Sequence, residues 1–584
     1  MLDKTDDISV SAENWLVQFE AALSDADIGA LEELFHPDSY WRDALALSWT
    51  LQTINGRDAI LTALKAQAAE AAPLGFMIAP GRAAPRKVMR AGTDCIETIF
   101  RFETRTGRGD GILRLIPDQA DGNRLKAWTL LTALEELKGF EEQLDVARPR
   151  GNAYSRDFRG PNWLDLRKAS NAYADRDPTV LVVGGGQSGL SIAARLKQLN
   201  VDTLIIDRMQ RIGDCWRKRY HALTLHNQVQ VNHLPYMLFP PNWPTYIPKD
   251  KLANWFESYV DGMELNFWTE TEFEGGSYDE KEGRWTVTIR RAGEKRVMHP
   301  RHVVLATGVS GIPNIPDIPG LNNFAGRRVH SSGYEDGEDC GKRAIVIGTG
   351  NSGHDIAQDL YSSGAAVTMV QRSSTLIVSI EPSAQLVYTP YNEGTLEDND
   401  LIAVSMPLKV ARRSHALTCQ KSADLDKELL DGLRRIGFKL DFGDDNTGWQ
   451  FKYLTRGGGY YFNVGCSDLL VRREIALTQF ADIDTFVAEG AKMKSGEIIP
   501  ADLIVLATGY RPQEELVRKL FGETVTNRVG TIWGFGDTQE LRNMYVRTGQ
   551  PGLWFIAGGL AQCRIGSKQL ALQIKAIEEG LIPR

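Results

Sequence analysis

Two glycine-rich segments with the same spacing are the residues of this sequence best suited to binding chemistry. Gly184, Gly186 and Gly189 follow an apolar, strand-like run and precede a helical pattern. Such glycines allow a tight turn and the close approach of a pyrophosphate, whose charge the helix N-terminus stabilises. The next strand-like run ends at Asp207, where a carboxylate can accept hydrogen bonds from a ribose. The first segment therefore predicts a site for a dinucleotide with a free ribose hydroxyl.

The second segment repeats this arrangement with a different charge. Gly348, Gly350 and Gly353 again stand between an apolar strand and a helical pattern. The place of the acid is taken by Gln371, and Arg372 follows it. A carboxylate there would repel a 2′-phosphate, whereas an arginine accommodates it, with a charge-assisted hydrogen bond of about 1.5–3 kcal/mol. We therefore expect NADPH at the second site and leave the use of NADH open; the alternative is that Arg372 is a solvated surface residue.

The composition restricts the classes of protein to which the chain can belong. Its 584 residues suffice for three or four domains. The net charge of −8 argues against a nucleic-acid partner, and no apolar run is long enough to span a membrane. The N-terminus is polar and acidic, unlike a signal peptide. Six scattered cysteines without ligand spacing fit a reducing compartment and predict no metal site. We expect a cytoplasmic protein.

Residues 1–140 predict an α+β domain of their own. Trp15, Leu16, Phe19 and Leu23 have helical spacing, and further helices are expected at 28–35 and from 56 to about 70. Alternating runs at 75–79, 94–103, 109–116 and 125–131 predict a half-buried antiparallel sheet. This order, with turns at 36–43 and 56–58, resembles the nuclear transport factor two-like (NTF2-like, SnoaL-like) cone fold. A catalytic pair of His36 and Asp43 is less favoured than a structural or dimerising lid, which leaves a homodimer open.

The rest of the chain predicts two nested Rossmann-like domains. A linker rich in proline, glycine and charge covers 141–177. We expect an FAD-binding domain at 178–335 and 500–584, interrupted by an NADPH-binding domain at 336–499 with an insertion at about 405–465. Two strand-like runs ending in Ala-Thr-Gly, at 306–308 and 507–509, mark the crossings between the domains. The tail, at 551–559, predicts a strand and then a helix from about Ser567, whose N-terminal dipole can stabilise negative charge on a ligand.

A third motif resembles the sequence fingerprint of a known enzyme family. Phe324, Gly326, His330 and Tyr334 form the pattern FxGxxxHxxxY just before the second glycine turn. This pattern resembles the fingerprint of the flavin-containing monooxygenases; the Baeyer–Villiger monooxygenases carry tryptophan in the last place. The resemblance covers about residues 178–580. Within the family, the chain is similar to the bacterial type II group, whose members have an N-terminal extension and often oxidise ketones.

The resemblance implies a mechanism. NADPH would reduce FAD, oxygen would add at flavin C4a to give a (hydro)peroxyflavin, and one oxygen atom of O2 would enter a small organic substrate. The flavin would supply this chemistry and the protein its position and dryness. Tyr334 favours N- or S-oxygenation, and the N-terminal extension favours the alternative, Baeyer–Villiger oxygenation of ketones. A remote alternative is an NADPH oxidase or reductase with a ligand-binding N-terminal module. Disulphide exchange is disfavoured, because Cys215 has Tyr220 where a partner cysteine would stand.

The resemblance also names candidate residues. The family has an asparagine beside flavin C4a, and either His226 or Asn227 takes that place here, although the usual proline is missing. The candidate catalytic residues are His226, Asn227, His330 and Tyr334, with His330 favoured as a structural or domain-coupling residue over a general acid. The candidate cofactor-binding residues are Gly184, Gly186, Gln187, Ser188, Gly189, Asp207, Arg208, Gly213, Trp216, His226, Ala306, Thr307, Gly308, Gly348, Gly350, Asn351, Ser352, Gly353, Arg372, Ser373, Ala507, Thr508 and Gly509. The glycine-rich run 457–465 is expected near the substrate entrance.

Overall fold

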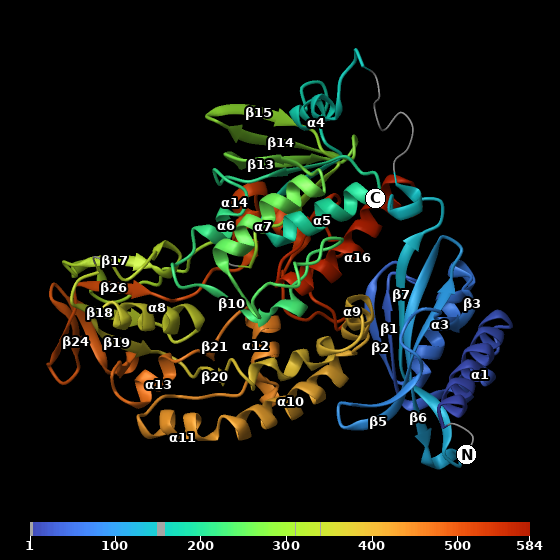
Figure 1. Cartoon of the computed structure of the whole chain (residues 1–584), viewed down its shortest axis with the longest axis horizontal. Helices are drawn as coiled ribbons and strands as arrows, with labels where there is room; N and C mark the ends of the chain where they lie inside the picture. The colour runs from blue at the N-terminus through green and yellow to red at the C-terminus, as the bar shows by residue number, and fades with distance from the viewer. Residues whose placement is uncertain (1–3, 149–157, 310, 339) are drawn as a thin grey trace.

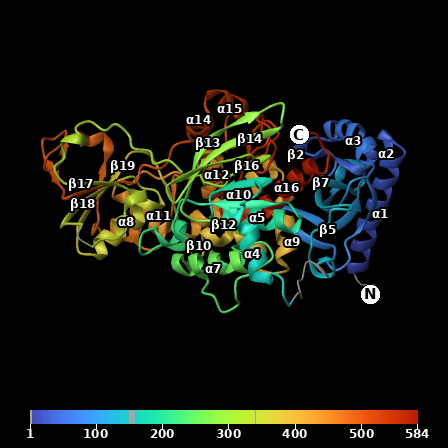
Figure 2. The same ribbon diagram turned by 90° about the horizontal axis from the view of Figure 1, so that it is seen from above.

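The computed structural model describes residues 4–148, 158–309, 311–338 and 340–584 (Figure 1). Part of the expected linker, 149–157, therefore lies outside the described residues. The chain forms three parts in a row: an N-terminal unit at one end, a first parallel sheet in the middle and a second parallel sheet at the other end (Figures 1 and 2). No described helix combines the length and apolarity needed to cross a membrane.

The N-terminal unit, residues 4–140, packs three helices against one seven-stranded sheet. The helices are α1 (Lys4–Ser24), α2 (Ile28–Leu34) and α3 (Arg57–Ala71). The strands are β1 (Phe35–Ala44), β2 (Leu51–Asn55), β3 (Leu74–Ile78), β4 (Arg86–Arg90), β5 (Thr93–Glu103), β6 (Gly107–Asp118) and β7 (Arg124–Leu137). Their order is β2-β1-β7-β6-β5-β3, with β4 also paired to β5. The expected helices and the four expected strand runs are present.

The expected turn at 36–43 is wrong, because this segment forms most of β1. The strand pairs antiparallel with β2 and parallel with β7. Its register shifts between Phe35 and Tyr40, the stretch that holds Pro37, whose missing N–H cannot join a ladder. Beyond this irregularity Trp41 is fully buried and its indole N–H donates to Thr132 of β7. The local turn signal is thus accommodated as a bulge inside a strand.

The first sheet has the order β12-β9-β8-β16-β27, and its pairs are parallel. Its strands are β8 (Val180–Val183), β9 (Thr203–Ile206), β12 (Asn266–Trp268), β16 (His302–Leu305) and β27 (Leu553–Phe555). Helices α5 (Gln187–Gln198) and α16 (Leu560–Glu578) pack against each other beside it. The tail helix therefore begins at Leu560, next to its N-cap Gly559, and not near Ser567 as expected. This doubly wound order is typical of dinucleotide-binding sheets.

The second sheet has the order β17-β26-β18-β19-β22, again all parallel. Its strands are β17 (Arg327–His330), β18 (Arg343–Ile347), β19 (Ala366–Gln371), β22 (Ala476–Gln479) and β26 (Leu503–Leu506), and α8 (Asn351–Ser362) follows β18. We expected β17 and β26 in the first domain, within 178–335 and 500–584. Strand pairing moves both into the second sheet, because β26 lies between β18 and β17 and Val329 of β17 stands opposite Val505 of β26.

The remaining elements surround the two sheets. Near the first sheet lie β10 (Thr224–Gln228), β11 (Tyr246–Pro248), β13 (Thr271–Asp279), β14 (Arg284–Arg291), β15 (Glu294–Met298), α6 (Asp214–Arg217), α7 (Lys249–Gly262) and α14 (Gln513–Phe521). Between the sheets and the N-terminal unit lie α9 (Leu396–Val404), α10 (Leu408–Leu425) and α12 (Gly448–Arg456) (Figure 1). The insertion at 405–465 is thus mainly helical, and its glycine-rich end forms β21 (Tyr460–Asn463), which pairs with β20 (Leu376–Ser379).

Candidate functional site

One large cavity, of about 1250 Å³, lies where the two sheets, the insertion and the N-terminal unit meet. Many of the residues predicted from the sequence line it. They are Gly184, Gly186, Gln187, Ser188, Asp207, Arg208, Trp216, His226, Asn227, Ala306, Thr307, Gly308 and Ser352. A volume of this size accommodates an extended ligand as well as a second, smaller one, since typical ligand pockets measure about 300–1000 Å³.

The first glycine turn has the close contacts that a pyrophosphate cradle requires. Gly184 has φ of +110°, a conformation that favours glycine. A Cβ on Gly189 would lie 1.9 Å from the Gly184 carbonyl oxygen, so the turn and α5 touch directly. Gly186 caps α5, and a Cβ there would meet only Cys215 Sγ, at 3.6 Å. The free backbone N–H groups of this helix end therefore face open space, and the residues fit a bound diphosphate.

The carboxylate of Asp207 is fixed by the backbone around it. Its Oδ2 accepts a hydrogen bond from Gly185 N at 2.7 Å, and its Oδ1 accepts one from Met209 N at 2.8 Å. Each oxygen keeps a lone pair for a ligand, and the side chain lines the cavity. The geometry suits a ribose diol held beside the first turn.

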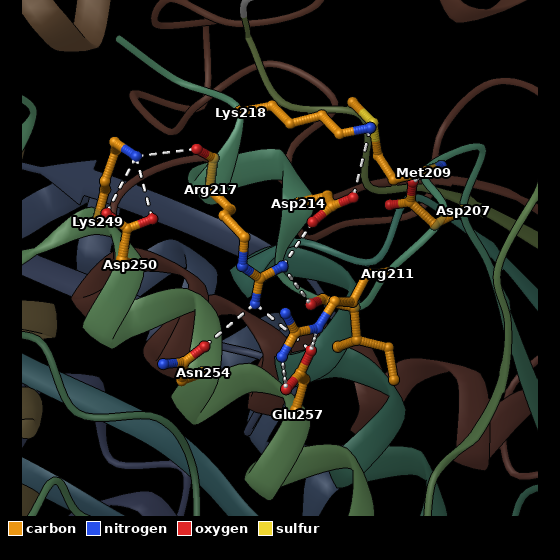
Figure 3. Close-up of polar contacts among 11 residues, drawn as sticks. Asp207, Met209, Arg211, Asp214, Arg217, Lys218, Lys249, Asp250, Asn254 and Glu257 are labelled. Atoms are coloured by element: carbon orange, nitrogen blue, oxygen red, sulfur yellow. Dashed lines mark hydrogen bonds and ion pairs between the residues drawn. The ribbon is translucent and has the colours of Figure 1, made fainter. Parts of the chain in front are cut away.

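A network of charged side chains holds the segment after Asp207 in place (Figure 3). Arg217 pairs with Asp214 at 2.5 Å and also reaches Glu257 of α7 at 3.4 Å. Arg211 donates to the same glutamate at 2.9 Å. Trp216, between these residues, donates its indole N–H to Gln187 of α5 at 3.2 Å. The network thus keeps an aromatic ring against the cavity beside the first turn.

Gly213 begins this segment and has a steric reason to be glycine. Its φ is +85°, and a Cβ there would lie 2.4 Å from the Ala253 carbonyl oxygen of α7. Gly213 itself does not line the cavity. Its role in the structure is the close approach of α6 to α7, which brings Trp216 into position.

The second glycine turn repeats the geometry of the first. Gly348 has φ of +120°, and a Cβ on Gly353 would lie 2.2 Å from the Gly348 carbonyl oxygen. Gly350 caps α8 without a side-chain bond. Of this turn only Ser352 lines the cavity; Asn351 accepts a hydrogen bond from Phe462 N at 3.0 Å, which joins the turn to β21.

Strand β19 ends at a buried, hydrogen-bonded glutamine, and an exposed arginine follows it. Gln371 is fully buried; its Nε2 donates to Lys439 O at 2.9 Å and its Oε1 accepts from Lys439 N at 2.8 Å. Arg372 and Ser373 follow it on the surface. The side chain of Gln371, at the position equivalent to Asp207, therefore bonds to the protein backbone, and the exposed Arg372 follows one residue later.

The two crossing turns also connect the sheets. Ala306, Thr307 and Gly308 end β16 and line the cavity. Ala507, Thr508 and Gly509 end β26 and do not line it; there Thr508 donates to Asn314 O at 2.5 Å. The first crossing therefore meets a ligand in the cavity, whereas the second bonds to the connecting chain.

His226 and Asn227 lie in β10 on the cavity wall. The His226 ring packs edge-on against Phe462, with centroids 5.1 Å apart. Burial lowers the pKa of His226 to about 4, so the ring is neutral at pH 7. A hydrogen bond joins Asn227 to the Tyr388 hydroxyl, another buried group of the wall. Both candidates for the place beside the flavin therefore face the same space.

His330 and Tyr334 lie in the second sheet's layer and do not line the cavity. His330 accepts a hydrogen bond at Nδ1 from Ser332 N (3.1 Å), so its Nε2–H donates to Gly509 O (3.0 Å). The Tyr334 hydroxyl donates to Asp359 of α8 at 2.6 Å. Burial lowers the pKa of His330. In this geometry the motif ties β17 to the second crossing turn and to α8.

Sequence patterns revealed only part of the aromatic and N-terminal cavity wall. Tyr460 and Phe462 belong to the run 457–465 that we expected near the substrate entrance, and both line the cavity. Further aromatic residues of the wall were not predicted, although their density in 449–453 was an available signal: Tyr388, Trp449, Phe451 and Tyr453. The N-terminal unit adds Arg42, Leu51 and Arg90, which no sequence pattern assigned to a cavity. Their place depends on packing between segments far apart in the sequence.

Two alternatives weighed from the sequence have clear structural outcomes. Cys215 lies on the cavity wall without a disulphide partner, and burial raises the pKa of its thiol to about 12; a thiolate for disulphide exchange is therefore disfavoured. In the N-terminal unit His36 accepts a hydrogen bond from Asp38 N, whereas Asp43 is fully buried and bonds to Ser48 and Thr132. A His36–Asp43 pair is not formed.

Comparisons with known proteins identify relatives of this chain. Residues 181–415 match the pyridine nucleotide-disulphide oxidoreductase family. An indole-3-pyruvate monooxygenase of Oryza sativa subsp. japonica, YUCCA1, is 35% identical over 351 residues, which is 60% of this chain and 80% of that protein. A probable indole-3-pyruvate monooxygenase of Arabidopsis thaliana, YUCCA4, is 31% identical over 341 residues, 57% of this chain and 76% of that protein.

Solved structures show the same fold. The open crystal structure of cyclohexanone monooxygenase has a TM-score of 0.52 at 17% identity, and the match covers 69% of this chain and 88% of that chain. A Rhodococcus cyclohexanone monooxygenase mutant bound to NADP+ has a TM-score of 0.51 at 16% identity, over 69% and 87% of the two chains. Together with the relatives above, this likeness shows that the chain belongs to the flavin monooxygenases, the FAD- and NADPH-dependent oxidoreductases that incorporate one atom of O2.

Proposed function

We propose that this protein transfers one oxygen atom from O2 to a soft nitrogen or sulfur atom of a small organic substrate. The observation that carries the proposal is the doubled turn: two glycine cradles of the same geometry stand at the ends of two parallel sheets that border one cavity. One sheet can thus hold the flavin and the other its reductant. An enzyme with one nucleotide would need only one such turn.

The two cradles take different nucleotides in this proposal. FAD is held by the first turn, with its pyrophosphate at the N-terminus of α5 and a ribose at Asp207. NADPH is held by the second turn, with its 2′-phosphate at the exposed Arg372. When bound, FAD supplies the activation of oxygen, which no protein side chain provides.

The protein's own residues supply dryness and a neutral wall. Trp449, Phe451 and Phe462 line the cavity beside Tyr388 and Tyr453, and aromatic surface of this kind excludes water. His226 is uncharged at neutral pH, since burial lowers its pKa to about 4. It offers one N–H donor and one acceptor nitrogen to a ligand and holds no charge that a substrate must balance.

Baeyer–Villiger oxygenation is the second candidate. The relatives named above are indole-3-pyruvate monooxygenases, whose substrate has a keto group, and the two solved structures compared above are cyclohexanone monooxygenases. A carbonyl carbon needs an attacking oxygen nucleophile, whereas a sulfide sulfur needs an electrophilic oxygen. The two candidate reactions therefore require different reactivity of the oxygen atom transferred at the same flavin site: nucleophilic toward ketones and electrophilic toward sulfides.

Product analysis under ¹⁸O₂ separates the candidates. The FAD-loaded enzyme would be supplied with NADPH and either methyl phenyl sulfide or cyclohexanone. Our proposal predicts methyl phenyl sulfoxide with one ¹⁸O atom and little lactone. A labelled lactone as the main product would establish the second candidate. Consumption of NADPH with stoichiometric hydrogen peroxide and no labelled product from either compound, or from a wider panel of amines and ketones, would refute both.

We further propose that the N-terminal unit has an NTF2-like fold and that the enzyme is cytoplasmic. In this proposal the N-terminal unit also provides the surface through which two copies of the protein form a homodimer. Support for the fold comes from three helices packed on one mixed sheet of seven strands. Size-exclusion chromatography with light scattering tests the pairing, because a monomeric mass would contradict it.

A further inference from the structure

We propose that the N-terminal unit forms the outer wall of the substrate end of the cavity and that Leu51 is a specificity-determining residue of this enzyme. The inference rests on the proposed function, because it assigns this end of the cavity to the substrate. Three sets of contacts carry it: residues of the N-terminal unit in the wall, a loop that the unit holds, and a helix that the unit positions.

The first set consists of residues of the N-terminal unit that line the cavity themselves. Arg42 of β1, Leu51 of β2 and Arg90 of β4 line the same cavity as the first glycine turn. Both arginines have a carboxylate partner: Arg42 pairs with Glu540 at 2.6 Å, and Arg90 pairs at 2.6 Å with Glu97, which also pairs with Arg86 and Arg114. Leu51, 6% exposed, is the apolar group that this unit presents to the cavity.

The second set joins β2 to a loop near the C-terminus. Thr53 N donates to Thr538 O at 3.0 Å, and the Thr53 hydroxyl donates to Glu540 at 3.0 Å. In return, Gln539 Nε2 donates to Thr53 O at 3.0 Å. Gln539, Glu540 and Leu541 all line the cavity. The strand that carries Leu51 therefore also fixes a second part of the wall.

The third set concerns α10, which lies between the N-terminal unit and α12 (Figure 1). Val410 is buried in a cluster with Tyr40, Ala91 and Trp128 of the N-terminal unit. Cavity-lining residues of the same helix are Leu408, Ala411, Ser414, His415 and Thr418, and their spacing of three and four residues places them on one helix face. Val410 borders this face, since it lies four residues before Ser414. The N-terminal unit thus holds α10 directly beside the residues that line the cavity.

The chemistry of this end of the cavity defines what it accepts. Its apolar groups include Leu51, Met406 and Leu408, and its arginines are paired. His415 packs against Phe451 with ring centroids 5.4 Å apart, and the structure records no hydrogen bond to its ring among the described residues. Because desolvation lowers the pKa of His415 to about 4 and leaves its ring uncharged at neutral pH, this end suits a largely apolar group with at most one hydrogen-bonding atom.

The test changes the size of residue 51 and measures binding apart from turnover. Leu51→Trp and Leu51→Ala would be prepared as full-length, FAD-loaded enzymes. Calorimetry without NADPH would give the Kd of methyl phenyl sulfide and of the bulkier methyl 2-naphthyl sulfide. We expect Leu51→Trp to raise the naphthyl-to-phenyl ratio of Kd at least ten-fold and Leu51→Ala to lower it at least three-fold. Met89→Trp is the matched control, since Met89 lies in β4 beside Arg90 but is 67% exposed.

The outcomes separate this inference from the proposed function. A ratio that stays within two-fold of the wild type in Leu51→Ala overturns the inference, whether or not Leu51→Trp folds. A ratio that changes equally in Met89→Trp also overturns it. If the Kd ratio changes with residue 51 but neither sulfide is oxygenated with NADPH, the role of Leu51 is supported and the proposed function is refuted. If both sulfides are oxygenated but the Kd ratio does not change with residue 51, the proposed function is supported and the role of Leu51 is refuted.

Discussion

Replacing Gly189 by alanine should release the flavin, because the added methyl group has no space. Its Cβ would lie 1.9 Å from the Gly184 carbonyl oxygen, more than 1 Å inside the 3.0 Å limit that real Cβ contacts keep. The obstacle is backbone, so α5 must move away from the turn. Overpacking of this kind costs about 1–3 kcal/mol. If that cost falls on the bound conformation, FAD affinity drops about 5- to 150-fold.

The measurement pairs this change with its equivalent in the second turn. A Cβ on Gly353 would lie 2.2 Å from the Gly348 carbonyl oxygen, so Gly353→Ala should raise the Kd for NADP+ by a similar factor and keep the flavin. FAD would be measured by its absorbance in the purified protein and by fluorescence titration of the apoprotein. Gly458→Ala is the control, because no atom lies within 4 Å of its Cβ. If Gly189→Ala kept FAD and lost NADP+ binding, the assignment of the two turns would be reversed.

Three further predictions use other parts of the structure. Arg372→Ala should raise the KM for NADPH at least ten-fold and that for NADH less than two-fold, because only NADPH carries the 2′-phosphate; equal losses in steady-state assays would refute the phosphate contact. Cys215→Ala should keep NADPH-dependent oxygenation within about three-fold, since its buried thiol has a raised pKa and no disulphide partner; a hundred-fold loss would indicate thiol chemistry. His354 is fully buried on Tyr461, and burial lowers its pKa to about 3. Its neutral form is favoured in the folded state, so its contribution to stability is full above about pH 6.5 and is lost as the pH falls toward 3, by about 2 kcal/mol at pH 5. His354→Phe should therefore reduce the loss of unfolding free energy between pH 8 and pH 5 by about that amount in urea titrations, and an unchanged loss would contradict the burial argument.

Local patterns predicted the parts of the fold that depend on local rules. The two glycine turns, their flanking strands and the first helices of the N-terminal unit follow from spacing and steric needs of a few adjacent residues. The segment 36–43 was predicted wrongly because Pro37 gives a turn signal, whereas pairing with β2 and β7 decides its conformation. Strands β17 and β26 were assigned to the wrong layer for the same reason: their partners lie more than a hundred residues away.

The candidate site was predictable only where a motif exists. Asp207, Trp216 and His226 line the cavity as their motifs indicated. His330 and Tyr334 belong to an equally clear motif but contact the second sheet and α8 instead. Leu51 carries no signal at all, since a leucine in a strand is ordinary and only the packing of the N-terminal unit brings it to the cavity. Sequence spacing thus located the two glycine turns, whereas only tertiary packing brings Leu51 to the cavity.

The position of β27 at the edge of the first sheet has a consequence for how the enzyme is made. This strand pairs with β16, and the helix that follows it packs on α5, yet both come from the last 32 residues of the chain. Residues up to 552 are therefore synthesised before the first sheet can gain this edge strand and α16. A variant truncated before residue 553 lacks both elements, so we expect it to bind FAD weakly even where its other parts fold.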